Sequence, residues 1–183
     1  TDTISDSDKQ VLKGSDISNN SEFGKKVLMG GDKMIATTAD NKIYYFEKNS
    51  DGTWPTTETM KIAPMNPADD VSSNRFGESL AMDSSSIVVG APGMDGSGGV
   101  FIYNTDDLSN NNLTIEYELH PQDVSGITEF GKKVAIDNGN IIVLGEESGT
   151  VKVNKNLKTD TFSWNESSIT GTKPSARDGN SSI

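Results

Sequence analysis

The sequence predicts an all-β fold of the β-propeller type, with about three four-stranded antiparallel blades that form an incomplete propeller or part of a larger one. The pair Phe-Gly recurs at Phe23-Gly24, Phe76-Gly77 and Phe130-Gly131, in steps of 53 and 54 residues. Each pair precedes two short apolar stretches separated by a polar turn. The composition, with 18 Gly and 32% hydrophobic residues, favours short strands and turns over a helical bundle.

The first two blades follow one order of strands. Residues 1–22 are expected to hold the last strand of a preceding blade, at residues 9–13, and a linker. Blade 1 covers residues 23–75, with strands near 26–29, 34–36, 43–46 and 59–62 and a hairpin turn at residues 50–53. Blade 2 covers residues 76–129, with strands near 79–82, 87–90, 99–104 and 114–119.

The third unit is less regular toward its end. Blade 3 covers residues 130–170, with strands near 133–136, 141–144 and 150–154 and a fourth strand at 161–164 or near Ser168. Residues 171–183 read as a polar tail. The alternative is a β-sandwich in which the spacing of the three Phe-Gly pairs is a coincidence.

The middle unit carries the fullest motif. Phe76-Gly77 is followed by Gly90-Ala91-Pro92, a glycine-rich stretch at 93–99 and an aromatic strand at 100–103. These residues resemble the FG-GAP repeat, the blade unit of integrin-type propellers and of many bacterial and algal surface proteins, and the resemblance covers about residues 9–165. The first unit departs from it with Ala36-Thr37-Thr38, and the third with Leu144-Gly145-Glu146.

The propeller reading assigns a packing role to the motif residues. Each Phe is expected to act as a wedge between neighbouring sheets, and each Gly to permit a close approach of two backbones. The predicted blade-packing residues are Phe23, Gly24, Phe76, Gly77, Phe130, Gly131, Gly90, Ala91 and Pro92.

Calcium is the cofactor that the resemblance implies, because integrin-type blades hold it in an Asp-rich loop between their first two strands. Here the equivalent turns are short and supply one carboxylate each, from Asp32, Asp83 or Asp137. We therefore expect no cofactor at these turns. Asp95, Asp69 and Asp70 remain candidates for weak cation binding, with the alternative that they are solvated turn formers.

The sequence offers little for catalysis. His120 is the only histidine, and there is no cysteine. The acid pairs Glu146-Glu147 and Asp106-Asp107 could serve glycoside hydrolysis, but adjacent acids usually point apart or into water. We therefore expect no enzymatic activity.

Charge and hydropathy narrow the range of partners. A net charge of −11 disfavours nucleic acid and anionic membranes. No stretch approaches the ~18 apolar residues of a membrane span. Candidate glycosylation sites are the sequons at Asn19, Asn112, Asn165 and Asn180. Trp54 and Trp164, near predicted hairpin tips, are candidate contact residues.

The resulting hypothesis is a non-enzymatic extracellular module, structural or adhesive, that contacts proteins or glycans through loops at the blade ends. Three blades leave open sheet edges and faces, which favour association. These faces are expected to be covered by self-association or by the remaining blades of a longer chain. The first alternative function is a self-assembling structural subunit of a filament or virion, joined through its open blade edges. The second alternative is a hydrolase on the same scaffold.

Overall fold

The computed structural model describes residues 9–63, 71–106, 115–120, 128–146, 150–154 and 169–170. These residues form three four-stranded antiparallel sheets, each with its strands in sequential order. The predicted all-β fold of propeller-type blades is confirmed, and we name the sheets blades 1, 2 and 3 in chain order. The short helix α1 (Val71–Asn74) and the 3-10 turn η2 (Met94–Gly96) are the helical elements within this part of the chain.

Blade 1 consists of β1 (Val27–Gly30), β2 (Lys33–Thr37), β3 (Ile43–Glu47) and β4 (Met60–Ile62). Its strands pair in register, with Leu28 opposite Ile35 and Ile35 opposite Tyr45. Side chains along a strand alternate between the two faces of the sheet. These three residues therefore share one face, which is the face that packs on blade 2.

Blade 2 consists of β5 (Ser79–Met82), β6 (Ser86–Ala91), β7 (Gly99–Asn104) and β8 (Ile115–Leu119). Every residue of β6 is buried, because this strand lies in the middle sheet and both of its faces are covered. The helix α1 leads into the Phe76-Gly77 corner, and η2 fills the connection between β6 and β7.

Blade 3 consists of β9 (Thr128–Asp137), β10 (Asn140–Glu146), β11 (Thr150–Asn154) and β12 (Ile169–Thr170). Its first strand begins before the Phe-Gly pair instead of after it, since Thr128 pairs with Glu146 across an irregularity in which β9 carries the extra residues. The predicted fourth strand at 161–164 and the polar tail at 171–183 lie outside the described residues.

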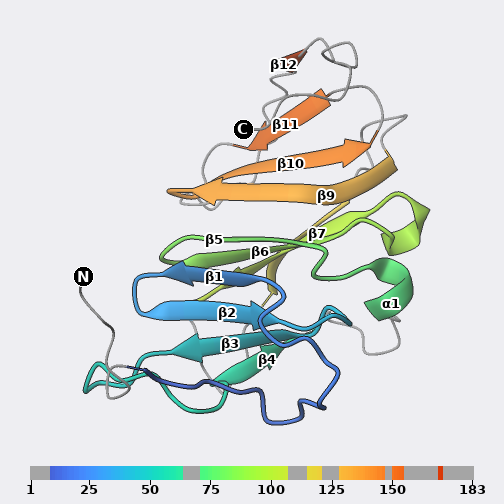
Figure 1. The fold of residues 1–183 in the computed structure, drawn as a ribbon. Helices are drawn as coiled ribbons and strands as arrows, with labels where there is room; N and C mark the ends of the chain where they lie inside the picture. Colours follow the sequence, from blue (N-terminus) through green and yellow to red (C-terminus); the bar gives the residue numbers. More distant parts are fainter. Residues whose placement is uncertain are drawn as a thin grey trace, which may run out of the picture.

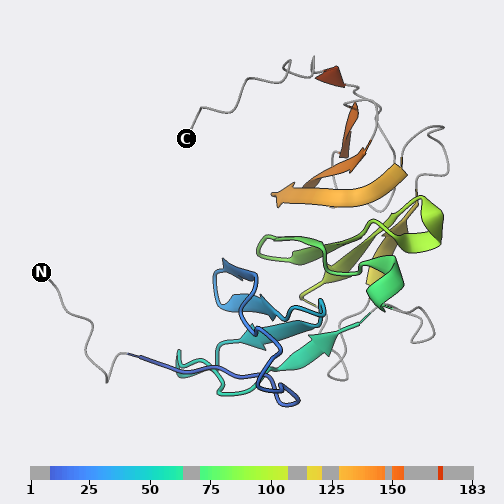
Figure 2. The same cartoon turned by 45° about the vertical axis from the view of Figure 1, so that its right-hand side comes forward.

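The three sheets pack face to face and fan apart (Figures 1 and 2). The first strands of successive blades lie next to one another, β1 against β5 and β5 against β9, on the same side of the fan. We call the face of each blade that carries its corner Phe the Phe face, and the other its opposite face. The Phe face of each later blade packs on the opposite face of the blade before it.

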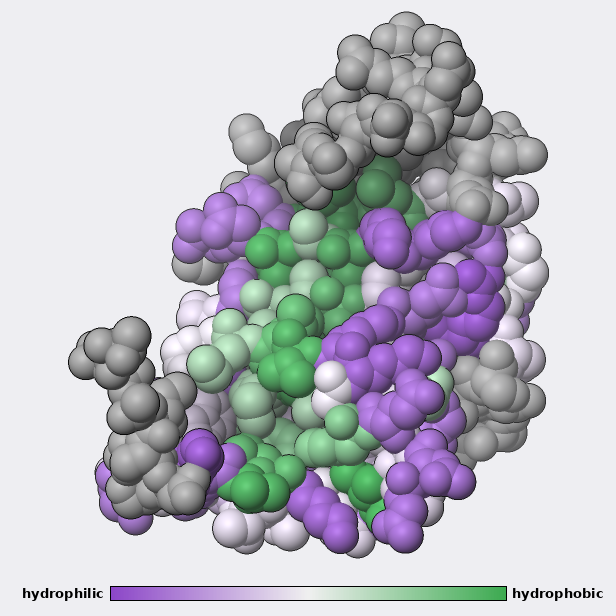
Figure 3. Space-filling view, viewed as in Figure 1, coloured by the Kyte–Doolittle hydropathy of each residue, from purple (hydrophilic) through white to green (hydrophobic). Residues whose placement is uncertain are grey.

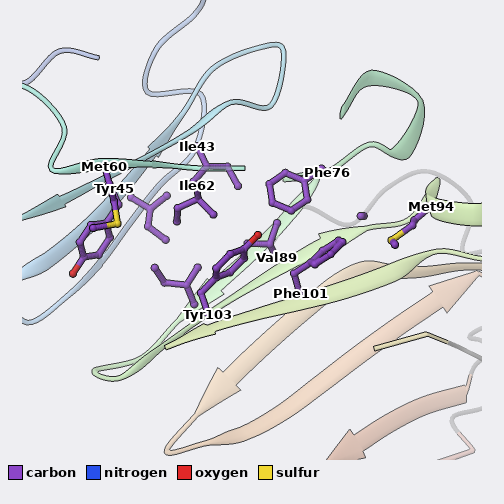
Figure 4. Close-up of a cluster of buried hydrophobic side chains, with 12 residues drawn as sticks. Ile43, Tyr45, Met60, Ile62, Phe76, Val89, Met94, Phe101 and Tyr103 are labelled. Carbon is purple, nitrogen blue, oxygen red and sulfur yellow. The ribbon is translucent and has the colours of Figure 1, made fainter. Parts of the chain in front are cut away.

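Three apolar clusters follow from this order. The first lies between blades 1 and 2, with Phe76 and Phe101 facing Ile43 and Ile62 (Figure 4). The second lies between blades 2 and 3, around Phe130. The third lies on the Phe face of blade 1, where residues of the N-terminal segment cover Tyr44 and Phe46. Burial of these faces supplies most of the driving force for stacking the sheets.

The N-terminal segment differs from the expectation. Residues 9–13 form no strand, and Lys13 makes only an isolated parallel bridge to Thr57. The segment lies against blade 1 of the same chain, where its hydrogen bonds and two apolar side chains find partners. Tertiary contacts, not strand pairing, therefore fix its conformation.

Candidate functional site

The three Phe-Gly corners share one backbone conformation. In each corner both the residue before Phe and the glycine after it have positive φ: Glu22 49° and Gly24 89°, Arg75 56° and Gly77 82°, Glu129 53° and Gly131 89°. Positive φ is costly for a residue with a side chain. A charged residue precedes each Phe, which is a repeated signal that the spacing of Phe-Gly alone did not reveal.

The corner phenylalanines occupy equivalent places in the three blades. Phe76 and Phe130 are buried between sheets, whereas Phe23 is only half-buried on the open face of blade 1. Phe76 meets the ring of Phe101 edge to face at 5.4 Å between centroids, and Phe23 meets Tyr44 in the same way at 5.4 Å. The corner is therefore formed in blade 1 even though no sheet covers it among the described residues.

The space around each corner glycine shows how closely the backbone of the neighbouring blade approaches it. A Cβ on Gly131 would lie 2.4 Å from the carbonyl oxygen of Gly99 in blade 2, and one on Gly77 would lie 2.9 Å from the carbonyl oxygen of Asn41 in blade 1. A Cβ on Gly24 would meet no atom within 4 Å. Close approach requires glycine at the two inner corners, and only backbone conformation requires it at the first.

Gly90-Ala91-Pro92 lies at the end of β6, where all three residues are buried or closely packed. A Cβ on Gly90 would lie 2.0 Å from the carbonyl oxygen of Gly131, so the Phe-Gly corner of blade 3 rests directly on this glycine. The strand register places Thr37 and Leu144 at the same position in blades 1 and 3.

Polar contacts join the blades at the corners. Lys26 donates from Nζ to the carbonyl oxygen of Gly77 at 2.8 Å, and Ser79, at the same position in blade 2, donates to the carbonyl oxygen of Gly131 at 2.6 Å. Desolvation between the blades lowers the pKa of Lys26. Blades 1 and 2 thus each tie their first strand to the corner of the next blade.

The charged residues before Phe also pair across blades. Arg75 binds Glu78 of its own blade through two nitrogens and binds Glu129 at the corner of blade 3. Hydrogen bonds to Glu78 and Glu129 raise the pKa of the Arg75 guanidinium further above its ordinary value. Glu22 occupies the corresponding position in blade 1 and is exposed.

In the turn between the first two strands of blade 2, a carboxylate makes a contact to blade 3. Asp83 accepts from the backbone N–H of Gly139 in blade 3 at 3.0 Å and from Ser85 and Ser86 in its own turn. Register makes Gly30, not Asp32, its counterpart in blade 1. Asp32 instead pairs with Lys48 at 3.1 Å.

Residues 10–17, which we call the cap segment, lie along the outer part of blade 1. Asp16 accepts from the hydroxyl of Tyr44 at 2.8 Å and pairs with Lys61 at 3.0 Å. Ser15 donates to Glu58 through both its backbone N–H, at 2.8 Å, and its hydroxyl. The hydrogen bonds from Lys61 and Tyr44 lower the pKa of Asp16.

A pocket of about 230 Å³ opens where blade 1, blade 2 and the cap segment meet. Its walls are mainly apolar, and charged side chains stand at its edge. It is lined by Ile43, Ile62, Ala63 and Phe76, with Asn41, Asp16, Lys42 and Lys61. An apolar floor with a few polar groups around it is the usual composition of a site that binds a small group. Sequence reasoning missed this pocket, because its residues come from four separate segments of the chain.

The other candidate residues are dispersed. Asp95 is exposed in η2, Asn19 is exposed before blade 1, and Trp54 packs on the cluster of Tyr44 and Phe46. Nε2 of His120 lies 3.0 Å from the carboxylate of Glu118. The remaining candidates lie outside the described residues: Asp69, Asp70, Asp107, Asn112, Glu147, Trp164, Asn165 and Asn180.

Metal and membrane features were searched in the same part of the chain. Across the described ranges, no three His, Asp or Glu side chains converge in a way that could hold a metal ion. No helix there is long and apolar enough to cross a membrane.

Comparison with known proteins agrees with the fold. The sequence profile of the FG-GAP repeat matches residues 57–103, which run from just before β4 to β7. The predicted resemblance to the FG-GAP repeat is confirmed over this segment, and the fold and the repeat together define a β-propeller-like module.

Other matches are more distant. No curated protein matches the chain. Among solved structures, the chain is similar to the crystal structure of human WBSCR16, with 16% sequence identity and a TM-score of 0.44 over 70% of this chain. The match covers 32% of that protein, so the chain spans about a third of its length.

Proposed function

We propose that this chain is a non-enzymatic extracellular module, structural or adhesive, that contacts protein or glycan partners at one end of its blades. The observation that carries the proposal is the pocket between blades 1 and 2. Its floor is held by the buried strands β3 and β4, and its edge carries an amide and three charged groups. A rigid scaffold that positions variable loop residues around a pocket is suited to recognition.

The chemistry of the pocket indicates what fits. Ala63 is exposed over the buried side chains of Ile43, Ile62 and Phe76, and this apolar lining suits the flat face of a sugar ring or an apolar peptide side chain. Asn41 and Lys42 also line the pocket and would bind hydroxyl or carboxylate groups of such a ligand, Lys42 while it pairs with Asp40 at 3.2 Å. Asp16 and Lys61 form an ion pair with each other at 3.0 Å, so we assign them the role of forming the rim of the pocket.

A blocking substitution tests this proposal. Ala63 is exposed at the pocket, and Ala63→Arg would fill the pocket while keeping the carbonyl oxygen that accepts from the Tyr103 hydroxyl. Ser50→Arg, at an exposed hairpin tip, is the matched control. A glycan array and a displayed peptide library should give binders that the wild type and Ser50→Arg share and that Ala63→Arg loses.

Two results would overturn the proposal. One is the absence of any binder that depends on the pocket. The other is a hydrolytic activity that His120→Ala abolishes, because the second hypothesis from the sequence would then be correct. Peptide mapping of the same protein, expressed through a secretory pathway, shows whether Asn19 carries a glycan.

A further inference from the structure

The first strands of the three blades, β1, β5 and β9, allow a direct comparison between covered and uncovered blade faces. We call the part of a face along this strand its inner part and the rest its outer part. Leu80 and Met82 on β5 pack against blade 1, and Val134 and Ile136 on β9 pack against blade 2. The same positions on β1 are Val27 and Met29, which are 55% and 65% exposed. Within the part of the chain that the structure describes, blade 1 therefore presents the inner part of an interblade face that is largely exposed.

The cap segment covers the outer part of the same face. Leu12 and Ile17 pack on the buried rings of Tyr44 and Phe46. A Cβ on Gly14 would lie 2.6 Å from the Tyr44 ring, so the segment is closely seated. At the interface of blades 1 and 2 this outer place is taken by strands β3 and β4, through Tyr45, Met60 and Ile62.

Blade 3 presents the complementary face at the other end of the array. Ile142 corresponds to Val88 and Ile35, which are fully buried against the next blade, yet it is 37% exposed. Lys133 corresponds to Lys26 and Ser79, which donate to the glycine carbonyl of the next corner, and it is exposed.

The apolar surface connects these two ends. In Figure 3 a band of apolar residues runs over β1, β5 and β9, with polar residues on both sides of it. The large hydrophobic side chains that are exposed in the described residues are Val11, Val27, Met29 and Ile142. Three of these four belong to the end faces, at positions that are contact positions in the interior of the array.

We propose that the Phe face of blade 1 binds the opposite face of blade 3 of a second copy of this chain. In this contact Val27 and Met29 pack near Ile142, and Lys133 donates to the carbonyl oxygen of Gly24. The contact repeats the geometry of the two interblade interfaces within one chain. It is heterologous, so it closes into a ring or continues as an open chain.

Two features keep the contact weak in the unmodified chain. The cap segment holds the place of the outer strands of a docking blade, so it competes with them. Glu129 of one copy, which Arg75 and Lys132 of its own chain bind, would also meet Glu22 of the other, so this corner lacks the opposite charges of the Arg75–Glu129 pair between blades 2 and 3. We therefore expect association that is concentration-dependent and readily reversible.

End-blocked variants of the full chain test the proposal by sedimentation velocity. Val27→Asp with Met29→Asp blocks one end, and Ile142→Asp blocks the other. Each variant alone should stay monomeric at 19.6 kDa, while an equimolar mixture should form a one-to-one pair, because each protein retains one working end. Ser50→Asp is the control, since Ser50 is exposed at a hairpin tip outside the cap segment and the strands of both end faces, and it should associate like the wild type.

Two further, gain-of-function variants are designed to strengthen self-association, so that the test does not depend only on the weak association expected of the wild type. Glu22→Lys restores the opposite charges of the interior corner and should tighten association roughly two- to fivefold at low salt, with the gain lost at high salt. Gly14→Val pushes the cap segment off Tyr44 and should also increase association. Circular dichroism must show that each variant keeps its strands.

The proposal fails if the wild type and both gain-of-function variants remain monomeric at every concentration. It also fails if the two end-blocked variants do not pair with each other, or if either one still associates alone. The contact uses the blade faces and not the pocket, so its failure would leave the proposed recognition function in place, and loss of binding by Ala63→Arg would leave this contact untouched.

Discussion

At the scale of single residues, the corner glycines share one backbone conformation, but glycine is required for different reasons at different corners. Gly24 and Gly131 both have φ of 89°. The neighbours of Gly131 leave no room for a Cβ, whereas those of Gly24 leave ample room. The first glycine is needed only for its conformation, and the second also for interblade contact.

This pair gives a matched substitution. Gly24→Ala should destabilise by about 1–2 kcal/mol through the left-handed backbone alone. Gly131→Ala should cost more, roughly 3 kcal/mol or above, because blade 3 must also move away from the Gly99 carbonyl. Urea unfolding measures both, and equal losses would show that the close approach carries no energy.

The carboxylates that hold the cap segment make its attachment depend on pH. Hydrogen bonds from Lys61 and Tyr44 lower the pKa of Asp16 below 3.8. Burial alone would raise the pKa of Glu58, but hydrogen bonds from Ser15 bring it below its ordinary 4.5. A lowered folded-state pKa means stability that is present above the unfolded value and is lost as the pH falls through the folded value.

We therefore expect the cap segment to detach below about pH 4 while the sheets persist. Amide exchange of residues 10–17, or fluorescence of Trp54 in a Trp164→Phe background, should report the transition. A variant with Asp16→Asn and Glu58→Gln should be loosened at neutral pH and should lack the acid transition. A cap that stays protected at low pH in the wild type would contradict the assignment of these groups.

At the scale of elements, the aromatic contact of the Phe face forms in blades 1 and 2 alike, although a sheet covers that face only in blade 2. The edge-to-face pairs of Phe76 with Phe101 and of Phe23 with Tyr44 have the same 5.4 Å separation. The strand hairpin and the corner therefore form within the blade. Only the burial of the pair depends on a neighbouring element.

Truncating each ring separates these two contributions. Phe76→Ala should cost roughly 3–5 kcal/mol, because it opens a cavity between two sheets. Phe23→Ala should cost less than half as much, since that ring is half-buried beside the cap segment. Chemical denaturation would give both values, and a larger loss at Phe23 would mean that the Phe face of blade 1 contributes more to stability than its exposure indicates.

At the scale of the whole molecule, the described sheets form a short linear array in which blade 2 packs between blades 1 and 3. The stability of such an array is approximately a sum of terms for each unit and for each interface. Blade 2 has an interface on both faces, whereas blades 1 and 3 each have one with another blade. The middle sheet should therefore be the most stable part.

Hydrogen exchange tests this ordering. Amides of Val88 and Val89 in β6, whose side chains are fully buried, should exchange last and only by global unfolding. Paired amides in β2 and β10, the corresponding strands of the outer blades, should exchange earlier through local opening. Equal protection in all three strands would indicate a single cooperative unit with no weaker ends.

Much of this architecture was predictable from local patterns. The strands expected at residues 79–82 and 99–104 match β5 and β7, because alternating apolar residues and flanking turn residues define them locally. Residues 9–13 have a similar pattern, with Val11 and Leu12 between polar residues, yet they form no strand. Whether an apolar segment becomes a strand depends on an available sheet edge, which local sequence does not specify.

The equivalence of the turns and the location of the pocket were also beyond local reasoning. Asp32 and Asp83 both lie in the turn between the first two predicted strands of a blade. The hydrogen-bond register nevertheless shows that the residue of blade 1 equivalent to Asp83 is Gly30. The pocket draws Asp16, Asn41 and Phe76 from three segments. Such groupings depend on how separate sheets pack, and a single sequence contains no direct record of that packing.

The sequence alone determined the repeat, the number of described blades and the positions of their Phe-Gly corners, because a fixed spacing of Phe-Gly and alternating apolar residues act through local conformation and burial. Tertiary structure alone decided that the N-terminal segment caps blade 1 and that the two end faces differ. Those outcomes follow from which apolar face finds a partner, and that choice is made only when distant parts of the chain pack together.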